Sequence, residues 1–182
     1  MNDIVRLAVI YGSVREGRFC DTVGAWVVDQ IRRRKMFELE VIDPAVEPVS
    51  AFGERLAAAD AFIVITPEYN HSYPSVLKAL IDSYKSEWLA KPVAFVSYGG
   101  AAGGLRAVEH LRHVFAELHA VGIRDGVSFP NVWEQFDDQG QPLSVRRAER
   151  GLVTMLARLA WWARSLSEAR AVRDFADAVS LD

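Results

Sequence analysis

The chain has 182 residues, of which 51% are hydrophobic and 25% are charged, with a formal net charge of −3. This composition is typical of a soluble globular protein, and we expect residues 1–182 to form a single domain. The small negative charge excludes an electrostatic reason to bind nucleic acid or an anionic membrane. The lone cysteine, Cys20, excludes an internal disulfide and a thiolate-rich metal site. The N-terminus lacks the pattern of a signal peptide and no segment has the length of a membrane span, so we expect a cytoplasmic protein.

The first predicted strand, Ile4–Tyr11, is a nearly continuous apolar run of the kind found in parallel sheets that are covered on both faces. It leads through a loop, Gly12–Cys20, into an amphipathic helix. Amides ahead of a helix N-terminus can hold an anion, and Ser13, Arg15 and Arg18 can add hydrogen bonds to a phosphate. The alternative is a turn with two solvated arginines. The loop matches neither GxGxxG nor GxxxxGK[ST], so the dinucleotide fingerprint and the nucleotide-triphosphate loop are both absent.

The second predicted strand is Phe37–Ile42, and a short helix is expected near Ser50–Ala59. The third strand, Ala61–Ile65, is an apolar run that stops at a polar loop, residues 66–74, before another amphipathic helix. A loop that joins a strand to a helix in this way lies at the carboxyl edge of a parallel sheet, where ligands bind in open α/β folds.

Prolines and serines are expected to shape this central loop. Pro67 and Pro74 restrict φ, and Pro74 suits the first turn of a helix. Ser72 and Ser75 can satisfy helix amides that have no partner within the helix. An ordinary strand-to-helix connection is the alternative interpretation.

The fourth predicted strand, Val93–Ser97, ends in a loop of small residues, Ser97–Gly104. Glycine allows a backbone to approach a flat ligand closely or to adopt a positive φ. The following helix has an apolar inner face that begins at Leu105. The histidines of this region lack a metal-ligand arrangement with nearby carboxylates, so no metal site is predicted.

The last predicted strand, Val121–Phe129, is interrupted at residues 124–126 and leads through a polar stretch to a long amphipathic helix. We expect Trp161 and Trp162 of this helix to pack in the core; the alternative is that one of them faces a partner subunit. The tail after Ala169 is polar and is expected to fray.

Five predicted strands alternate with five helices, which favours a flavodoxin-like α/β three-layer sandwich. Its five-stranded parallel sheet would have the order 2-1-3-4-5, with helices on both faces. Strands one, three and four are neighbours in this order, so the loops that follow them converge. One loop suits a phosphate, one the polar edge of a flat ring, and one a close backbone contact. Together they favour a mononucleotide with a large aromatic base.

Three segments, GSVREGRF, TPEYNHSYPSVLKALIDSY and PVAFVSYGGAAGGLRAVEHLR, resemble the NAD(P)H-dependent FMN reductase family, which includes quinone, azo-dye and chromate reductases. The likeness spans the whole chain, and TPEYNxSxP followed by LKxxID is its most specific part. The resemblance implies a flavodoxin-like fold and non-covalently bound FMN. It also implies transfer of a hydride from NADPH or NADH through the flavin to small acceptors such as quinones, azo compounds or free flavin.

The resemblance further implies which residues hold FMN. The first loop would hold the phosphate, the central segment would lie along the flavin and ribityl chain, and the glycine loop would meet the isoalloxazine ring. In that order the residues are Ser13, Arg15, Arg18, Phe19 and Cys20; Pro67, Glu68, Tyr69 and Asn70; and Ser97, Tyr98, Gly99 and Gly100. The chain departs from the family at Arg18, where Ser is frequent, at Cys20, where a small polar residue is frequent, and at Ser75, where Gly is usual. Arg18 is expected to strengthen phosphate binding or to reach toward the pyridine nucleotide, and Cys20 to weaken FMN binding.

No catalytic residue is predicted, because a flavin accepts the hydride itself and the protein contributes binding, orientation and electrostatics. Backbone amides near the pyrimidine edge are expected to stabilise the reduced flavin. Tyr69, His71 and Tyr98 are candidate acids that we expect to be walls or partner contacts instead. Two other functions remain open: an FMN-binding electron carrier, and an FMN-responsive interaction protein without reductase activity.

The active unit is expected to be a homodimer or homotetramer. Tyr73, Tyr84 and Trp88 add aromatic surface around the helix that follows the central loop, and aromatic residues are enriched at interfaces. The family resemblance points the same way, because such reductases place the flavin near a subunit boundary. The competing interpretation is that Trp88 covers the sheet edge within its own chain.

Overall fold

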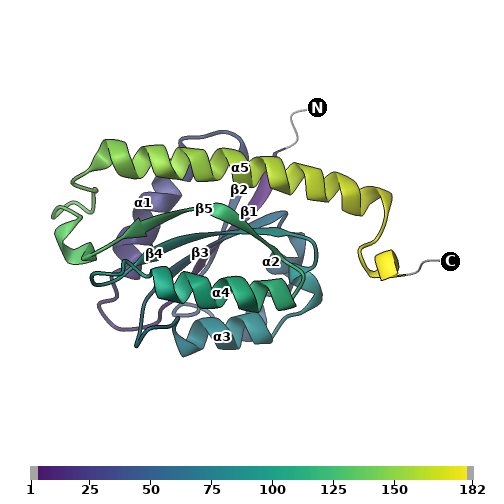
Figure 1. The fold of residues 1–182 in the computed structure, drawn as a ribbon, viewed down its shortest axis with the longest axis horizontal. Helices are drawn as coiled ribbons and strands as arrows, with labels where there is room; N and C mark the ends of the chain where they lie inside the picture. Colours follow the sequence, from purple (N-terminus) through teal and green to yellow (C-terminus); the bar gives the residue numbers. More distant parts are fainter. Residues whose placement is uncertain (1–3, 180–182) are drawn as a thin grey trace.

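The computed structural model describes residues 4–179, and within them five β-strands form one parallel sheet in the order β2-β1-β3-β4-β5. Helices α1 and α5 cover one face and α2, α3 and α4 cover the other, so the predicted three-layer flavodoxin-like fold is confirmed (Figure 1). The strands are β1 (Val5–Tyr11), β2 (Phe37–Ile42), β3 (Ala61–Pro67), β4 (Pro92–Tyr98) and β5 (Val121–Phe129). The helices are α1 (Cys20–Arg32), α2 (Gly53–Ala58), α3 (Ser75–Asp82), α4 (Leu105–Glu117) and α5 (Val145–Val172), with short 3₁₀ turns at Val49–Ala51, Ser86–Trp88, Val132–Glu134 and Ala176–Val179.

The central strands are mostly apolar because helices cover both of their faces. Every residue of β3 and of β4 is buried, including Thr66 and Ser97 near their ends, whereas β2 at the edge of the sheet alternates between half-buried and exposed positions up to the buried Ile42. The short helix expected near Ser50–Ala59 is divided into a 3₁₀ turn and α2, with Phe52 between them.

The register of the sheet brings the ends of β1, β3 and β4 to one edge. Tyr11 pairs with Ile65, and Pro67 pairs with Tyr98. The pairing continues past the strands, because the Gly12 amide donates to the Ile65 carbonyl at 2.8 Å and the Glu68 amide donates to the Tyr98 carbonyl at 3.1 Å. The loops after these three strands therefore begin side by side.

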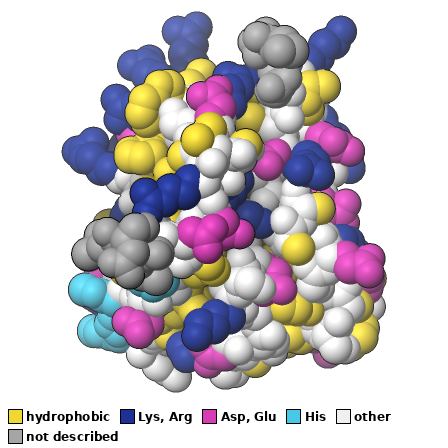
Figure 2. Space-filling model, turned by 90° about the vertical axis from the view of Figure 1, so that its right-hand side faces the viewer, with side chains coloured by type: hydrophobic (Ala, Val, Ile, Leu, Met, Phe, Trp, Pro, Cys, Tyr) yellow, Lys and Arg dark blue, Asp and Glu magenta, His cyan; other side chains and the backbone are white. Residues whose placement is uncertain are grey.

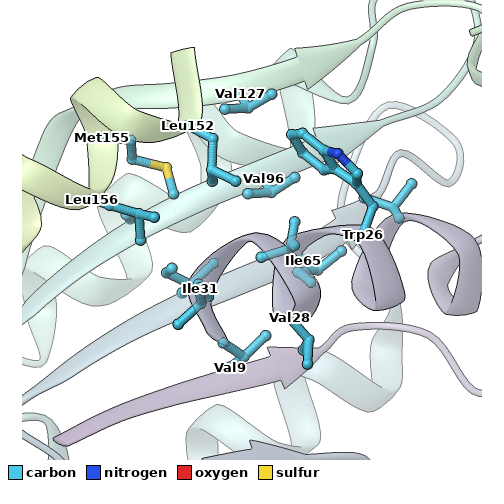
Figure 3. Close-up of a cluster of buried hydrophobic side chains, with 14 of the residues drawn as sticks. Val9, Trp26, Val28, Ile31, Ile65, Val96, Val127, Leu152, Met155 and Leu156 are labelled. Carbon is cyan, nitrogen blue, oxygen red and sulfur yellow. The ribbon is translucent and has the colours of Figure 1, made fainter. Parts of the chain in front are cut away.

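The core between the sheet and α1 and α5 is built from aliphatic side chains around one indole. Figure 3 shows Leu152 and Leu156 of α5 facing the sheet, with Val96 of β4 and Trp26 of α1 beside them. The Trp26 ring meets the Phe129 ring edge-on at 5.6 Å between centroids. Each side chain buried in this way stabilises the fold by roughly 1.5–3 kcal/mol relative to leaving it exposed.

Trp88 lies in the core on the opposite face, so its predicted place at a subunit interface is wrong. The side chain is 0% exposed, and its ring meets those of Phe62 and Phe115 edge-on at 4.7 and 5.5 Å. The indole N–H donates to the carbonyls of Ile81 and Tyr84. The competing interpretation, that Trp88 covers the sheet within its own chain, is the one that the structure supports.

The long helix α5 turns its leucine stripe inward and its tryptophans outward. Leu152, Leu156 and Leu159 are buried as predicted, but Trp161 is 61% exposed and Trp162 is 36% exposed, so their predicted core packing is wrong. The two indoles contact each other edge-on at 5.1 Å. Figure 2 shows Lys and Arg side chains gathered at the top of the molecule, the layer that α5 occupies in Figure 1. Among the helices of residues 4–179, none combines the length and apolar character needed to cross a membrane.

The interruption of β5 and the position of Leu105 can be compared with what the sequence predicts. The predicted interruption of β5 is confirmed as a bulge, where the register with β4 shifts between Val93 and Phe95. A Cβ at Gly126 would lie 2.9 Å from the Phe95 carbonyl oxygen, so the bulge requires glycine there. Leu105, expected on the inner face of α4, is 56% exposed because it occupies the first position of the helix.

Lys91 is a buried cation that joins the start of β4 to the end of α2. It is 7% exposed, and its ammonium donates to the carbonyls of Leu56 at 3.1 Å and Ala57 at 2.7 Å. Burial, assisted by the nearby Arg170 charge, lowers the pKa of Lys91 to about 8. Folding therefore makes Lys91 easier to deprotonate, while its charged form still predominates below pH 8.

We predict that Lys91 makes stability rise with pH above 8. Below pH 8 the amine is charged in both states and only the folded state bears the desolvation cost; between pH 8 and 10.5 the unfolded chain binds more protons, so folding gains. As pH rises from 8 to 10.5, the unfolding free energy of the native protein should increase by roughly 1–3 kcal/mol relative to that of the Lys91→Met variant, at about 1.4 kcal/mol per pKa unit. Urea unfolding of both proteins between pH 8 and 10.5 measures the difference in their unfolding free energies. The contributions of the titratable groups that both proteins contain cancel in this difference. A difference that does not change with pH would contradict the assignment.

Candidate functional site

Three loops meet at the carboxyl edge of the sheet: the first loop (residues 12–19), the central loop (residues 68–74) and the glycine loop (residues 99–104). The hydroxyls of Ser13 and Tyr69 share a hydrogen bond of 2.8 Å, which joins the first two loops. The Phe19 ring lies 6.5 Å from the Tyr98 ring, where the glycine loop begins. The predicted convergence of the loops is confirmed.

The first loop keeps several backbone donors without a partner. In the part of the chain that the structure describes, the amides of Glu16, Gly17, Phe19 and Cys20 donate no hydrogen bond. They lie at or just before the N-terminus of α1, where the helix dipole favours an anion. Ser13 is fully buried beneath this loop.

Arg15 is the exposed cation of the first loop. Its guanidinium lies 4.0 Å from the centre of the Tyr69 ring, and it forms no ion pair with any residue among 4–179. Stacking of a guanidinium on an aromatic face leaves its N–H groups free to bind an oxyanion.

Arg18 has protein partners in place of the phosphate that the sequence predicts for it. Its guanidinium donates to both carboxylate oxygens of Asp43, at 2.7 and 2.5 Å, and to Asp21 at 2.8 Å. It also donates to the Ser13 carbonyl, and its side chain is only 7% exposed. Burial pushes the pKa of Asp43 upward, but the hydrogen bonds from Arg18 outweigh it and leave that pKa below its usual value.

Asp43 is a residue that the sequence reasoning missed, although a signal was present. It follows β2, the neighbour of β1, so its carboxylate reaches the same edge of the sheet as the first loop.

The Cys20 thiol faces the core rather than the loop. The side chain is 0% exposed, with Sγ 4.0 Å from the Ile65 carbonyl oxygen, and burial raises the pKa of the thiol to about 11. The expected effect of a thiol donor on FMN binding therefore has no support, and the Cys20 amide alone is available to a ligand.

The central loop contains a tight turn that the sequence reasoning did not predict. Asn70 and His71 both have positive φ, of 50° and 68°, and Tyr69 and Ser72 exchange backbone hydrogen bonds of 2.8 and 3.0 Å. Two positive φ values in succession define a type I′ turn, for which Asn is a favoured residue.

The predicted serine caps on α3 are wrong. The residue that precedes α3 is Pro74, and no side chain caps the helix. Ser72 instead shares a hydrogen bond of 2.9 Å with Nδ1 of His110 on α4.

Glu68 connects the central loop to α4. Its carboxylate accepts from the Arg106 guanidinium at 2.6 Å and from the Arg106 amide at 3.1 Å. The side chain is 9% exposed, and a carboxylate suits the first turn of a helix. The structure thus gives the Glu68 side chain a partner within the protein, while its Cβ lies beside Gly99.

In the glycine loop, the fold requires glycine at positions other than those predicted to meet a ring. Gly103 and Gly104 have positive φ, and a Cβ would lie 2.4 Å from Ser128 Oγ at the first and 2.7 Å from Ser97 Cβ at the second. A Cβ at Gly100 would meet only Trp133, at 3.8 Å. The buried Ser97 hydroxyl donates to the Gly103 carbonyl at 2.8 Å.

This loop also offers free donors and an exposed indole. The Gly99 amide donates to the Phe129 carbonyl, but the amides of Gly100, Ala101 and Ala102 donate no hydrogen bond within residues 4–179. Trp133, which the sequence reasoning did not place at the site, is 61% exposed beside Gly100.

The Tyr98 side chain points into the core, away from the loop surface. It is 4% exposed, and its hydroxyl has no hydrogen-bond partner among the described residues. Burial, with the neighbouring Cys20, raises the pKa of the Tyr98 phenol far above its usual value. Tyr98 is therefore unsuited to act as an exposed wall or as a proton donor, although its buried ring lies beside Phe19 of the first loop. Residues 4–179 contain no group of three His, Cys, Asp or Glu side chains arranged to hold a metal ion.

Comparison with known proteins identifies a family that the sequence matches. The sequence profile of the NADPH-dependent FMN reductase family matches residues 5–134. An NAD(P)H-dependent FMN reductase of Schizosaccharomyces pombe is 35% identical over 130 residues, which cover 60% of this chain and 64% of the relative, so more than a third of that relative lies outside the match. A protein of Oryza sativa named probable NADPH:quinone oxidoreductase 1 is 30% identical, with 81% of this chain and 86% of the relative covered.

Among solved structures, the fold is similar to that of the flavoenzyme NAD(P)H:(acceptor) oxidoreductase from Paracoccus denitrificans. The TM-score is 0.70 at 22% identity, covering 89% of this chain and 98% of the other.

The two arginines of the first loop should respond differently to removal of their charge. Arg18→Met leaves Asp43, which is 14% exposed, without its cation, and should lower the free energy of unfolding by about 3–5 kcal/mol. The matched variant Arg15→Met removes one exposed stacking contact and should cost under about 1 kcal/mol. Urea unfolding at neutral pH compares them. Equal losses would show that the Arg18–Asp43 pair does not hold the loop.

Proposed function

Because this chain belongs to the NADPH-dependent FMN reductase family, we propose that it binds FMN without a covalent link and passes a hydride from NADPH or NADH to small acceptors. The observation that carries the proposal is the meeting of three loops at one sheet edge with unpaired backbone amides on two of them. One loop offers donors for a phosphate and another offers donors for the polar edge of a ring.

The phosphate end of FMN fits the first loop. Its free amides at Glu16, Gly17 and Cys20 would bind phosphate oxygens at the N-terminus of α1. Arg15 would turn its free N–H groups to the same anion, and Ser13 would give up its hydrogen bond with Tyr69 to donate to it. Arg18 contributes indirectly, because its hydrogen bond to the Ser13 carbonyl fixes the loop from behind.

The ring end fits the glycine loop. Gly99 and Gly100 leave room for a flat ligand, and the free amides of Gly100 and Ala101 would face its polar edge. The segment from Pro67 to Asn70 would lie along the ribityl chain between the two ends. Ser97 supports this arrangement from below by its bond to the Gly103 carbonyl.

The flavin supplies the redox chemistry when it is bound, and this chain supplies binding, orientation and electrostatics. Amides fixed by the fold would stabilise negative charge that develops at the ring edge, because they need no rearrangement. None of the three candidate acids is placed as a general acid for the ring: Tyr98 points into the core, His71 is exposed, and the Tyr69 hydroxyl lies against Ser13 at the phosphate end of the site. We therefore assign no catalytic residue.

Quinones are the acceptors that the names of the relatives suggest, and azo compounds and free flavin belong to the same proposal. A homodimer or homotetramer remains part of it, supported by the family resemblance but no longer by Trp88, which is buried. The cytoplasmic location and the single domain stay predictions from the sequence.

An electron carrier or an FMN-responsive interaction protein would use the same fold without a pyridine-nucleotide site. Carriers of this fold are typically much more acidic than the net charge of −3 found here. Direct reduction of the bound flavin by NADPH separates the reductase from the other two functions, because only a reductase is reduced in this way.

We predict that the purified protein binds one FMN per chain and that NADPH bleaches the flavin absorbance under anaerobic conditions. Riboflavin should bind more weakly because it lacks the phosphate, and FAD should bind more weakly because the first loop leaves little room for an adenylate. Anaerobic absorbance spectra before and after NADPH, together with equilibrium titrations, measure these outcomes. A bound flavin that NADPH and NADH both leave oxidised would eliminate the reductase and favour the carrier.

Arg15→Ala should weaken FMN binding by roughly 1.5–3 kcal/mol, the value of a hydrogen bond to a charged group. Riboflavin binding should change far less, because the phosphate is missing. Arg33→Ala, which removes the exposed arginine directly after α1 that pairs with Asp29, is the matched control and should leave both affinities unchanged. Fluorescence titration of each variant with each ligand supplies the comparison. Equal losses for FMN and riboflavin would assign Arg15 to another part of the ligand.

A further inference from the structure

A cleft runs between the edge strand β5 and the first turns of α5, apart from the three loops. Two adjoining cavities of about 310 and 440 Å³ form it, and they share Gly126, Arg147 and Gly151 in their walls. Gly126 belongs to the bulge of β5 and Gly151 to α5, so no side chain from these positions enters the gap. The size falls in the range of small-molecule sites, roughly 300–1,000 Å³.

One half of the cleft has mixed walls. Its apolar residues are Val127 and Phe129 from β5, Pro130 and Pro142 from the connection to α5, and Ala148 from α5, and its polar residues include Ser128, Gln135 and Ser144. Such walls suit a planar ring that gains from leaving water and carries a few hydrogen-bonding groups.

The other half is strongly cationic. Arg146, Arg147 and Arg150 line it, and within residues 4–179 their guanidinium groups form no ion pair or hydrogen bond. The carboxylate in the wall, Asp125, is already paired with Arg158 at 2.6 Å.

This accumulation of positive charge is unfavourable for the folded protein alone. The first turn of α5 has no acidic residue, so the arginines add to the positive end of the helix dipole. Arg33 and Arg106 are exposed arginines with carboxylate partners, whereas Arg32 and Arg124 have none within residues 4–179; the cleft differs in that three unpaired arginines lie together. An anion in the cleft would relieve the repulsion, which water at the surface does only partly.

We propose that this cleft binds an aromatic anion, with its ring beside Val127 and Pro130 and a phosphate or sulfonate group held by Arg147 and Arg150. None of the residues that line the cleft belongs to the three loops, so the site is separate from the proposed flavin site. Two sources share this chemistry: a nucleotide and an aromatic sulfonate.

Isothermal titration of the FMN-loaded protein with naphthalenesulfonate, adenosine monophosphate and inorganic phosphate tests the proposal. Both aromatic anions should bind more tightly than phosphate, and the tighter of the two identifies the source. Arg147→Gln/Arg150→Gln should weaken binding of that ligand at least about tenfold, through loss of charge-assisted hydrogen bonds. Arg32→Gln/Lys35→Gln removes two exposed cations at and just after the C-terminus of α1, which do not line the cleft, and should change this affinity less than about twofold.

A second variant tests the shape of the cleft without a change of charge. A Cβ at Gly151 would make only an ordinary contact of 3.7 Å with Val127, so Gly151→Ala should fold and should stabilise α5. The added methyl group narrows the cleft at Gly151, which lines both cavities. It should weaken binding of the aromatic ligand at least about threefold and leave the affinity for FMN unchanged.

Three outcomes would overturn the proposal. They are no binding of either aromatic anion, equal weakening by the two double variants, and binding of phosphate as tight as that of the aromatic ligands. The readout is binding of a probe to the cleft, so it does not depend on whether the protein reduces FMN.

Discussion

The parallel pairing of β1, β3 and β4 is the constraint on which the candidate site depends. Parallel strands in register end at one edge, and two backbone bonds, from Gly12 to Ile65 and from Glu68 to Tyr98, extend the pairing into the loops. The starts of the three loops are therefore fixed by main-chain geometry. Side-chain links such as Ser13–Tyr69 act on positions that the sheet has already set.

The sheet could be predicted from the sequence because its strands are defined by local patterns. The continuous apolar runs of β1, β3 and β4 can be satisfied only by burial on both faces, which requires helices on both sides of a parallel sheet. Once strands and helices alternate, the carboxyl edge follows without any knowledge of side-chain contacts, and so does the meeting of the loops. The ligand roles of individual residues do not follow in the same way, because they depend on which partner each side chain finds.

Arg18 and the tryptophans show which features the local sequence patterns did not predict. The partner that decides the role of Arg18 is Asp43, which lies 25 residues away and becomes a neighbour only when β2 pairs with β1. Trp88 sits in a three-residue turn with no periodicity to indicate its direction. Trp161 is different, since adjacent residues of a helix point about 100° apart and the leucine stripe already occupied the inner face. That expectation failed for a reason that the sequence contained.

The partners of each arginine show whether its charge stabilises the fold or is available to a ligand. Arg18 is neutralised by two carboxylates and Arg106 by one, so both contribute to the shape of the site rather than to its potential. Arg15 faces an aromatic ring and no carboxylate, beside amides that also lack partners. A folded chain gains stability by pairing such groups internally, and departures from that rule are concentrated at functional sites. By the same criterion Arg147 and Arg150 belong with Arg15, because neither has a carboxylate partner within residues 4–179 and both line one cleft.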